Sequence, residues 1–416
     1  MTDFVNESKS TFKNDEDSDG TESTSSMKLA DYNTLKGWDD IEDGDMNVLR
    51  GIYSYGFETP SPIQQKAIPP MIDRRDMIAQ AQSGTGKTGA FTVGTLNIID
   101  TSKKTTQAIV MAPTRELALQ ISNVFINIGT FLENYKVQLL VGGGSVDEDI
   151  KKLKDKDGPP HVVVGTPGRI HDMIRRNHVN VKNIRVLTLD EADEMLSTGF
   201  KDQVYNIFQY MPKNIQLCLY SATVPNDIAE LSKKFMRDPV RILVKSEMLT
   251  LEGISQFHIN IEDDQGKYLT LKDLYESLSV SQCIIYCNSV KRVQDLYQAL
   301  LEDGFPVAAI HSSMDKQERT ESYKDFKSGK SRVLVSSNVT ARGIDVQQVS
   351  IVINFDVPKC VHTYLHRIGR SGRWGRKGIG INFVTKRDFR YIKAIEQHYS
   401  TQITELPSNY RDIISG

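Results

Sequence analysis

The sequence predicts an α/β protein with two tandem domains, each a parallel sheet flanked by helices. Short apolar runs alternate with segments whose apolar residues recur at three- and four-residue spacing, which is typical of strands that alternate with helices. The alternation is interrupted over Lys245–Gly253 and then starts again. The length, 416 residues, exceeds what one ordinary core needs and suits two. We therefore expect a first domain over 36–244, a linker over 245–253 and a second domain over 254–416.

The expected strands are the short apolar runs, and several of the segments between them have helical spacing. In the first domain we expect strands at Met77–Ala81, Ala108–Ala112, Val137–Val141, Val162–Gly165, Val186–Leu189 and Gln216–Tyr220. In the second domain we expect them at Phe257–Ile261, Cys283–Tyr286, Val307–Ile310, Val333–Val335, Ile351–Asn354 and Ile379–Val384. Helical spacing is clear in Glu116–Phe131, Arg169–Arg176, Val290–Leu301 and Lys316–Phe326. Most glycine-rich and polar clusters directly follow a strand, where open parallel sheets bind their ligands.

Residues 1–35 are expected to form a disordered acidic tail, because they are rich in Ser, Thr, Asn, Asp and Glu and poor in apolar residues. No apolar run is long enough to cross a bilayer, and the N-terminus lacks the layout of a secretory signal. We expect a cytoplasmic protein with no membrane partner, and the nucleus is the other possible location. The net charge of −2 offers no general attraction to nucleic acid, so a nucleic-acid site would have to be a local cleft.

The four cysteines, Cys218, Cys283, Cys287 and Cys360, have no paired CxxC spacing. Three of them lie within apolar, strand-like runs. We expect reduced thiols rather than a zinc site or disulfides.

A phosphate-binding loop is predicted directly after the first strand. The loop fits the pattern GxxxxGK[ST], except that alanine replaces the first glycine, and it reads Ala81, Gln82, Ser83, Gly84, Thr85, Gly86, Lys87 and Thr88. Glycines let the backbone bend so that its N–H groups surround phosphate oxygens, while Lys87 reaches the terminal phosphates and the Thr88 hydroxyl can ligate Mg²⁺. The simpler interpretation is a glycine-rich turn with an unrelated lysine, but the strand before the loop and the helix after it favour the phosphate site.

An acidic cluster follows a later strand of the same domain. Val186–Leu189 ends in Asp190, Glu191, Ala192 and Asp193. Asp190 at a strand end beside a phosphate loop can hold Mg²⁺ through water, and Glu191 can orient and deprotonate an attacking water. On its own, such a cluster would more often be a solvated helix start. The phosphate loop upstream favours the catalytic interpretation.

The chain resembles the DEAD-box RNA helicases, and it is most similar to the eukaryotic translation initiation factor 4A subfamily. Asp190-Glu191-Ala192-Asp193 is the family's signature, and the resemblance extends from Trp38 to the C-terminus with the motifs in the family's order. The resemblance implies tandem RecA-like (P-loop NTPase) domains and an RNA-dependent ATPase that uses ATP and Mg²⁺. In that family the ATP site is shared between the two domains.

The resemblance also implies roles for further residues around ATP. Gln64, in a segment similar to the family's Q motif, would read the adenine edge, and Asp345 would hold the ribose. In the segment His366–Arg373, Arg370 and Arg373 would be arginine fingers that reach the γ-phosphate. The residues implied to couple hydrolysis to RNA strand separation are Ser221, Thr223, Arg342 and His366. A basic RNA-facing patch without a catalytic role is the alternative for the arginines.

RNA-binding motifs are implied on both domains. Their arginines, hydroxyls and glycine turns suit a sugar-phosphate backbone, and no aromatic stacking platform accompanies them, so we expect binding that is independent of base sequence. Taken singly, each motif is more often a helix cap or a turn. The residues implied to contact RNA are Arg115, Gly143, Thr166, Arg169, Asn288, Arg319 and Ser337.

The chain departs from the family pattern at several positions of the second domain. The usual Thr-Asp before the late Arg-Gly is Ser337-Asn338, the usual Gln before Arg319 is Lys316, and Ser312-Ser313 replaces Gly-Asp. Because Asn338 lacks a charge that would help to order its loop, we expect weaker coupling between the domains than is usual. The motifs implied in catalysis are intact.

The sequence therefore predicts an ATP-dependent RNA helicase that unwinds RNA locally, and the subfamily resemblance points to translation initiation. We expect a monomer that is directed to RNA by a protein partner such as a scaffold factor. One alternative is an ATP-dependent RNA clamp that remains closed within a larger RNA–protein complex. Another is a DNA helicase or a general P-loop ATPase, which the RNA-type motifs disfavour.

Overall fold

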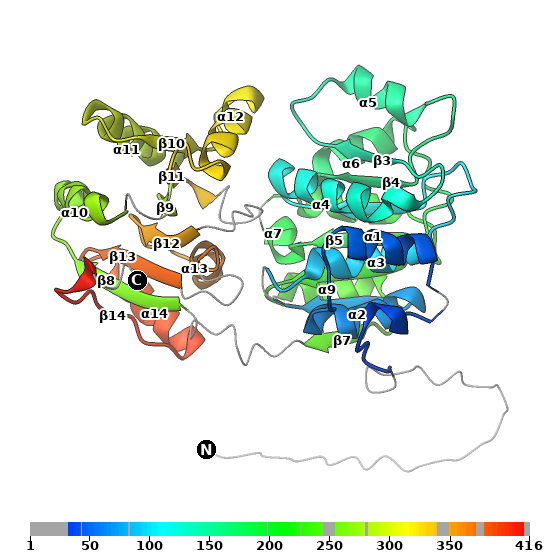
Figure 1. The fold of residues 1–416 in the computed structure, drawn as a ribbon, viewed down its shortest axis with the longest axis horizontal. Helices are drawn as coiled ribbons and strands as arrows, with labels where there is room; N and C mark the ends of the chain where they lie inside the picture. The colour runs from blue at the N-terminus through cyan, green and yellow to red at the C-terminus, as the bar shows by residue number, and fades with distance from the viewer. Residues whose placement is uncertain are drawn as a thin grey trace, which may run out of the picture.

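Two seven-stranded parallel sheets organise the chain, one in each lobe of Figure 1. The computed structural model describes residues 32–42, 44–81, 84–197, 199–224, 226–243, 254–278, 282–338, 349–371 and 378–411. Helices cover both faces of each sheet, which confirms the predicted tandem α/β architecture. Within the described residues, no helix combines the length and the apolar character that a membrane span requires.

The first sheet consists of short strands that are mostly buried along their whole length. The strands are β1 (Met77–Gln80), β2 (Ala108–Met111), β3 (Val137–Leu140), β4 (Val162–Gly165), β5 (Val186–Asp190), β6 (Gln216–Ser221) and β7 (Val240–Leu243). Their order across the sheet is β3-β4-β2-β5-β6-β1-β7. Because helices cover both faces, β2, β4, β5 and β6 are buried at every residue rather than at alternate ones.

The helices of the first domain bury two separate apolar clusters, one against each face of the sheet. They are α1 (Met46–Ser54), α2 (Pro62–Ile72), α3 (Lys87–Ile98), α4 (Arg115–Ile128), α5 (Val146–Leu153), α6 (Pro167–Arg175), α7 (Ala192–Ser197), α8 (Lys201–Tyr210) and α9 (Asn226–Phe235), with short 3-10 helices at η2 (Trp38–Asp40) and η3 (Gly129–Phe131).

The second domain repeats this plan. Its strands are β8 (Ile254–Asn260), β9 (Gln282–Tyr286), β10 (Val307–Ile310), β11 (Val333–Ser336), β12 (Val349–Asn354), β13 (Gly378–Val384) and β14 (Thr404–Glu405), in the order β10-β11-β9-β12-β13-β8-β14. Its helices are α10 (Asp264–Leu278), α11 (Val290–Glu302), α12 (Lys316–Lys327), α13 (Val361–Ile368) and α14 (Phe389–Tyr399). Figure 1 shows α12 and α13 on the side that faces the first domain.

The register of the first sheet brings three motifs to one edge. Gln80, the last residue of β1, pairs with Ser221, and Asp190 at the end of β5 pairs with Tyr220 of β6. Since the strands are parallel, the segments that follow them leave from the same edge. The phosphate loop, the acidic cluster and Ser221 are therefore neighbours in space although they lie far apart in the sequence.

The structure differs from the sequence-based expectations at the last strand of each domain and at the start of the first domain. Strands β7 and β14 were not anticipated, because β7 alternates between buried and exposed residues and β14 has only two residues. The first domain begins before residue 36, since Leu35 is buried in its core and its N–H donates to the Gln65 carbonyl. The expected linker and the expected tail up to residue 31 lie outside the described residues.

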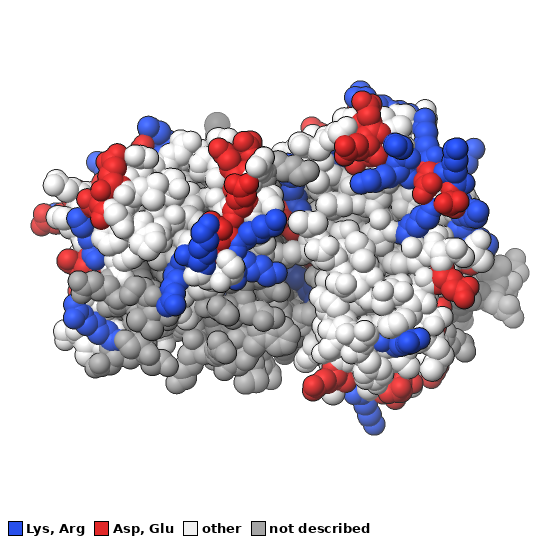
Figure 2. Space-filling model, turned by 45° about the horizontal axis from the view of Figure 1, so that its top comes forward, with Lys and Arg blue, Asp and Glu red and all other residues white. Residues whose placement is uncertain are grey.

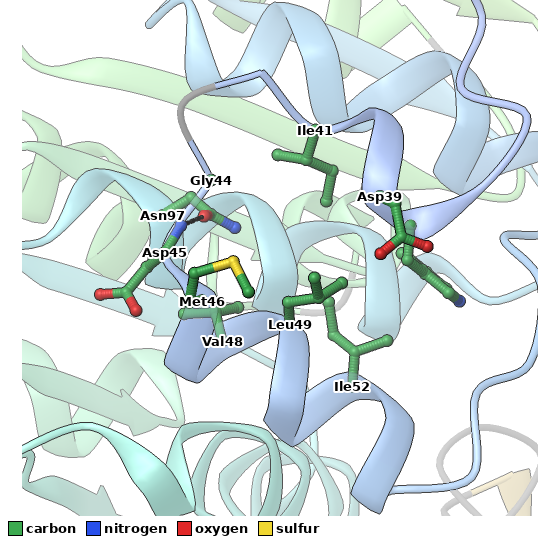
Figure 3. Close-up of a pocket in the computed structure, with 10 residues that line it drawn as sticks. Asp39, Ile41, Gly44, Asp45, Met46, Val48, Leu49, Ile52 and Asn97 are labelled. Carbon is green, nitrogen blue, oxygen red and sulfur yellow. Dashed lines mark hydrogen bonds between the residues drawn. The ribbon is translucent and has the colours of Figure 1, made fainter.

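Trp38 secures the N-terminal segment to the first domain. Its ring is buried and stacks on Phe57 with a centroid distance of 6.0 Å. A small pocket of about 160 Å³ lies beside it, and there the Asp45 N–H donates to Asn97 Oδ1 at 2.9 Å. Figure 3 shows the side chains that line this pocket. The pocket lies between η2, α1 and α3 and is lined by Trp38, Asp39, Ile41, Gly44, Asp45, Met46, Val48, Leu49, Ile52 and Asn97.

Candidate nucleotide and RNA site

The phosphate loop leads from β1 into α3. Gly84 and Gly86 have φ values of 84° and 102°, in the left-handed region that glycine adopts without a steric penalty. α3 begins at Lys87, so the free N–H groups of its first turn face the loop. Ala81 lies at the end of the strand, and its N–H donates to the Ser221 carbonyl at 3.0 Å. This bond uses the backbone alone, so alanine in place of glycine at this position leaves it intact.

Lys87 links the phosphate loop to the acidic cluster. Its Nζ lies 3.3 Å from Glu191 Oε1, and both side chains are about 95% buried, with 4% and 5% exposed. Glu191 has a φ of 53°, an uncommon conformation for a residue other than glycine, directly where β5 turns into α7. The lysine is thus held at the place where terminal phosphates are expected to bind.

Asp190, Glu191 and Asp193 crowd three carboxylates into a buried space with one lysine. Burial raises the pKa of Asp190, Lys87 opposes the shift, and Glu191 and Asp193 add to it. This excess of buried negative charge favours a bound cation, and carboxylate and hydroxyl oxygens are the ligands that Mg²⁺ prefers. The cluster and Thr88, in the first turn of α3, carry oxygen ligands of this kind, although among the described residues no three His, Cys, Asp or Glu side chains converge on one metal position.

Gln64 lies against the phosphate loop. Its Oε1 accepts a hydrogen bond from the Ser61 N–H at 2.7 Å, and its Nε2 donates to the Gly86 carbonyl at 3.2 Å. Gly89 leaves room for the Gln64 amide, because a Cβ at that position would lie 2.4 Å from Gln64 Nε2. A glutamine amide has two acceptor and two donor positions, so one of each remains for an adenine edge.

Asp193 joins the acidic cluster to the segment after β6 and to the second domain. Thr223 Oγ1 donates to Asp193 Oδ2 at 2.8 Å, and the Asp193 N–H donates to Ser221 Oγ at 3.3 Å. His366 of α13 approaches the same carboxylate, with Nε2 at 3.7 Å from Oδ2. Sequence reasoning placed Asp193 in the signature but assigned it no role of its own, because only the tertiary structure brings these partners together.

Arg367 lies in the last turn of α13, Arg370 lies two residues beyond the end of the helix, and both are buried. Arg370 Nε donates to the His366 carbonyl at 3.3 Å, which places the guanidinium beside the histidine that approaches Asp193. Arg367 points into the second domain. Its guanidinium donates to amide oxygens of Asn288, Asn338 and Asn354 and to the Asp356 carbonyl.

Arginines from both domains gather beside α4. Gly143 has a φ of 77°, which favours glycine, and a Cβ there would lie 2.4 Å from Arg115 Nη1, so a larger residue would displace the guanidinium. Burial lowers the pKa of Arg115, Glu116 opposes the shift, and the nearby charges of Arg319 and Arg169 add to it. Figure 2 shows further Lys and Arg side chains on the second domain beside the boundary between the lobes.

Several of the expected RNA contacts also have structural partners. Arg169 is paired with Asp149 and donates to the Gly144 carbonyl, so it supports the glycine turn at Gly143. Thr166 is the N-cap residue of α6, and Asn288 accepts from Arg367 Nη2 at 2.8 Å.

Ser337 is buried at the end of β11. The remaining expected site residues, Gln82, Ser83, Arg342, Asp345 and Arg373, lie outside the described residues.

Comparisons with known proteins identify the family. A DEAD/DEAH box helicase domain matches residues 61–231, and a helicase conserved C-terminal domain matches residues 266–375. The chain is 54% identical over 367 residues to the ATP-dependent RNA helicase eIF4A of Pyricularia oryzae, covering 88% of this chain and 92% of the relative. The chain belongs to the DEAD-box family of ATP-dependent RNA helicases. Its RecA-like domains, its enzymatic class and its use of ATP agree with the sequence-based predictions.

Solved structures share the two-domain fold of this helicase. Saccharomyces cerevisiae Dbp5 bound to RNA and ADP–BeF3 superposes with a TM-score of 0.84 at 34% identity, covering 92% of this chain and 99% of that one. A Dbp5 variant bound to a Gle1 variant and IP6 has a TM-score of 0.74 at 34% identity, covering 92% and 98%. The two Dbp5 structures have the same identity to this chain and nearly the same coverage. The higher TM-score of the RNA-bound complex therefore indicates that the lobes of this helicase are arranged more like those of that complex.

Proposed function

We propose that this RNA helicase hydrolyses ATP in a site shared by its two domains, and that closure of the domains couples hydrolysis to local unwinding of RNA. The contact of His366 with Asp193, at 3.7 Å across the domain boundary, carries the proposal. It joins the arginine-rich segment of the second domain to the acidic cluster of the first. The likeness of the domain arrangement to Dbp5 bound to RNA and ADP–BeF3 also supports it.

In the first domain, the chain's residues would bind ATP and prepare a water for attack. The backbone of Ala81–Thr88 and Lys87 Nζ would hold the phosphates, while Gln64 would pair with the adenine and Asp345 of the second domain would hold the ribose. Glu191 would accept the proton of the attacking water. Its Oε1 lies 3.3 Å from Lys87 Nζ, so base and phosphate ligand share one small volume.

Thr88 and Asp190 would hold Mg²⁺, Asp190 partly through water. Bound there, the ion would neutralise charge on the β- and γ-phosphates. The crowded carboxylates that raise the pKa of Asp190 support this assignment.

In the second domain, Arg370 and Arg373 would neutralise charge that develops on the γ-phosphate. Arg370 is buried and bonded to the His366 carbonyl, which gives it a defined place beside the domain contact. Ser221, Thr223, Arg342 and His366 would transmit closure between the nucleotide and the RNA.

RNA would bind through its backbone along the edge where the domains meet, at Arg115, Gly143, Thr166, Arg169, Asn288, Arg319 and Ser337. The gathered arginines supply a local positive field in a chain whose net charge is −2. Such contacts do not depend on base sequence.

The cellular role that we propose is translation initiation in the cytoplasm, because the initiation factor relative named eIF4A is 54% identical. We propose that the protein acts as a monomer and that a scaffold protein directs it to RNA, since the chain itself has no general positive charge. The helicase relatives favour an active enzyme over a permanent clamp.

Replacing the proposed base tests the mechanism. We expect Glu191→Gln to lower RNA-stimulated ATP turnover by about 10²- to 10⁴-fold, because the water would lose its proton acceptor. Binding of ATP and of single-stranded RNA should change little, since the amide keeps the shape of the side chain. Glu230→Gln, an exposed change of the same chemistry on α9, is the control. Normal turnover by the Glu191 variant would show that another group is the base.

Duplex-release and ATPase assays on the wild-type chain separate the helicase from the RNA clamp and from the DNA helicase. A helicase should release the short strand of an RNA duplex with ATP, whereas a clamp would bind RNA without turnover. Stimulation of the ATPase by single-stranded RNA and not by single-stranded DNA is the expected result, and equal stimulation by both would contradict the RNA assignment.

A further inference from the structure

Two side-chain pairs connect helix α4 of the first domain to helix α12 of the second. Arg319 Nη2 lies 3.0 Å from Glu116 Oε1. One turn further along both helices, Gln120 Nε2 lies 3.3 Å from Tyr323 Oη. The second pair lies four residues after the first on each helix, so the two helices lie side by side at this contact and run in the same direction. We call these four residues the α4–α12 clasp.

The clasp lies directly beside the proposed RNA path. α4 begins at Arg115, where the Thr114 side chain caps the helix by accepting from the Leu117 N–H at 3.2 Å. Arg319, the clasp residue of α12, contributes to the positive field at Arg115. The start of α4 and the arginine of α12 are therefore held at a definite spacing when the clasp is formed.

The clasp is a second connection between the domains, separate from the one at the nucleotide site. The first connection joins His366 of α13 to Asp193, whereas the clasp joins α12 to α4. One contact alone would allow the domains to rotate about it, and two contacts on different helices restrict that rotation. The clasp therefore restrains the relative orientation of the domains more than the contact at the nucleotide site does alone.

We propose that Gln120 and Tyr323 are positioning residues for RNA: their hydrogen bond stabilises the closed arrangement in which both domains grip one RNA strand. This proposal rests on the closure mechanism proposed above. Tyr323 acts through its hydroxyl group, because its ring packs against the second domain's own apolar cluster. Glu116 and Arg319 form the ionic half of the clasp, and the Tyr323–Gln120 pair is the neutral half.

The test is a double-mutant cycle. Tyr323→Phe removes only the hydroxyl, and Gln120→Met replaces the amide with an apolar chain of similar length. Loss of one neutral hydrogen bond corresponds to about a 3- to 10-fold loss of affinity. With a non-hydrolysable ATP analogue present, each variant should bind labelled single-stranded RNA that much more weakly. The double variant should bind no more weakly than either single variant.

Steady-state kinetics provide a readout that a merely structural role would not move. The KM for RNA should rise by the same factor, whereas kcat at saturating RNA and the affinity for ATP without RNA should stay unchanged. Tyr399→Phe is the matched control, since it removes a hydroxyl that donates to the Val361 carbonyl at 3.0 Å within the second domain. It should leave RNA affinity unchanged.

Three results would overturn the proposal. Additive losses in the double variant would mean that the two residues do not act as a pair. Equal losses without nucleotide would mean that they contact RNA directly rather than through closure. No loss in either variant would mean that the bond contributes nothing. If the wild-type chain lacks RNA-stimulated ATPase activity, the closure mechanism itself fails, and that measurement is made first.

Discussion

The carboxyl edges of the two sheets carry opposite imbalances of charge. In the first domain, Asp190, Glu191 and Asp193 are buried around Lys87, so carboxylates are in excess. In the second domain, the buried Arg367 has only neutral hydrogen-bond acceptors among the described residues, three of them asparagine side chains. The Arg367 guanidinium also lies over the ring of Tyr286, with its carbon 5.2 Å from the ring centroid.

In the proposed mechanism, this difference gives a reason for an ATP site that is divided between the two domains. Burying unbalanced charge is costly, so the excess of carboxylates at the first edge favours a cation, whereas the nearby charge of Asp356 balances Arg367 in part at the second edge. The first edge accepts cations and, with Lys87, phosphate. The second edge supplies positive charge through α13 and connects to the first at His366. In the proposed mechanism, the first domain carries out the chemistry, and the second domain contributes charge and position.

The largest effect should come from removing the charge that the second domain contributes. We expect Arg370→Ala to lower kcat for RNA-stimulated ATP hydrolysis by about 10³-fold or more, because an arginine finger neutralises charge in the transition state. Steady-state ATPase assays at saturating ATP and RNA measure it. Arg390→Ala, an exposed arginine that stacks on Tyr391, is the control. Unchanged turnover in the Arg370 variant would show that Arg370 is not an arginine finger.

A smaller effect should come from the excess of carboxylates in the first domain. Because burial raises the pKa of Asp190 from 3.8 to about 7, the folded domain binds a proton that the unfolded chain has released between these pH values. Without Mg²⁺ and nucleotide, the free energy of unfolding should therefore fall as the pH rises from about 4 to 7. The loss is about 1.4 kcal/mol for each unit of pKa difference.

Urea unfolding at pH 5 and pH 7, followed by tryptophan fluorescence to which the buried Trp38 contributes, measures this dependence. Asp190→Asn should flatten the dependence on pH, because the amide does not titrate. Mg²⁺ with an ATP analogue should also flatten it in the wild-type chain. Stability that rises equally with pH in the wild-type and variant chains would show that Asp190 is not responsible.

The smallest effect should come from restoring the family's aspartate in the second domain. Asn338 Oδ1 accepts two hydrogen bonds from Arg367, from Nε at 2.9 Å and from Nη2 at 2.6 Å. Asn338→Asp would make them charge-assisted, so we expect the second domain to gain about 1 kcal/mol of stability. Thermal unfolding should show it as a rise in Tm, and Asn338→Ala should lower Tm. A decrease with aspartate would mean that Arg367 is already balanced by charge.

Much of the fold could be predicted because its signals are local. Buried parallel strands are continuous apolar runs, and β4 (Val162–Gly165) has the predicted bounds. α11 and α12 each start at the predicted residue and end one residue beyond the predicted end. The prediction failed for β7, where an edge position leaves one side of the strand exposed.

The candidate site could be predicted where a short motif carries the chemistry. The glycines at positions 84 and 86, with Lys87 after them, identify the phosphate loop from residue type and spacing alone. Arg319 was expected to face RNA, and the structure adds an ion pair to Glu116 that no local pattern signals. The role of Asn338 as an acceptor for Arg367 is visible only once β11 and α13 lie together.

The sequence by itself determined the two-domain α/β plan, the phosphate loop and the acidic cluster, because backbone conformation and burial follow from neighbouring residues. Only the tertiary structure decided which groups meet across the domains, namely His366 with Asp193 and the four residues of the α4–α12 clasp. The physical reason is that these contacts join residues more than 170 positions apart. Their distances are set by how two separately folded sheets pack, which no local spacing records.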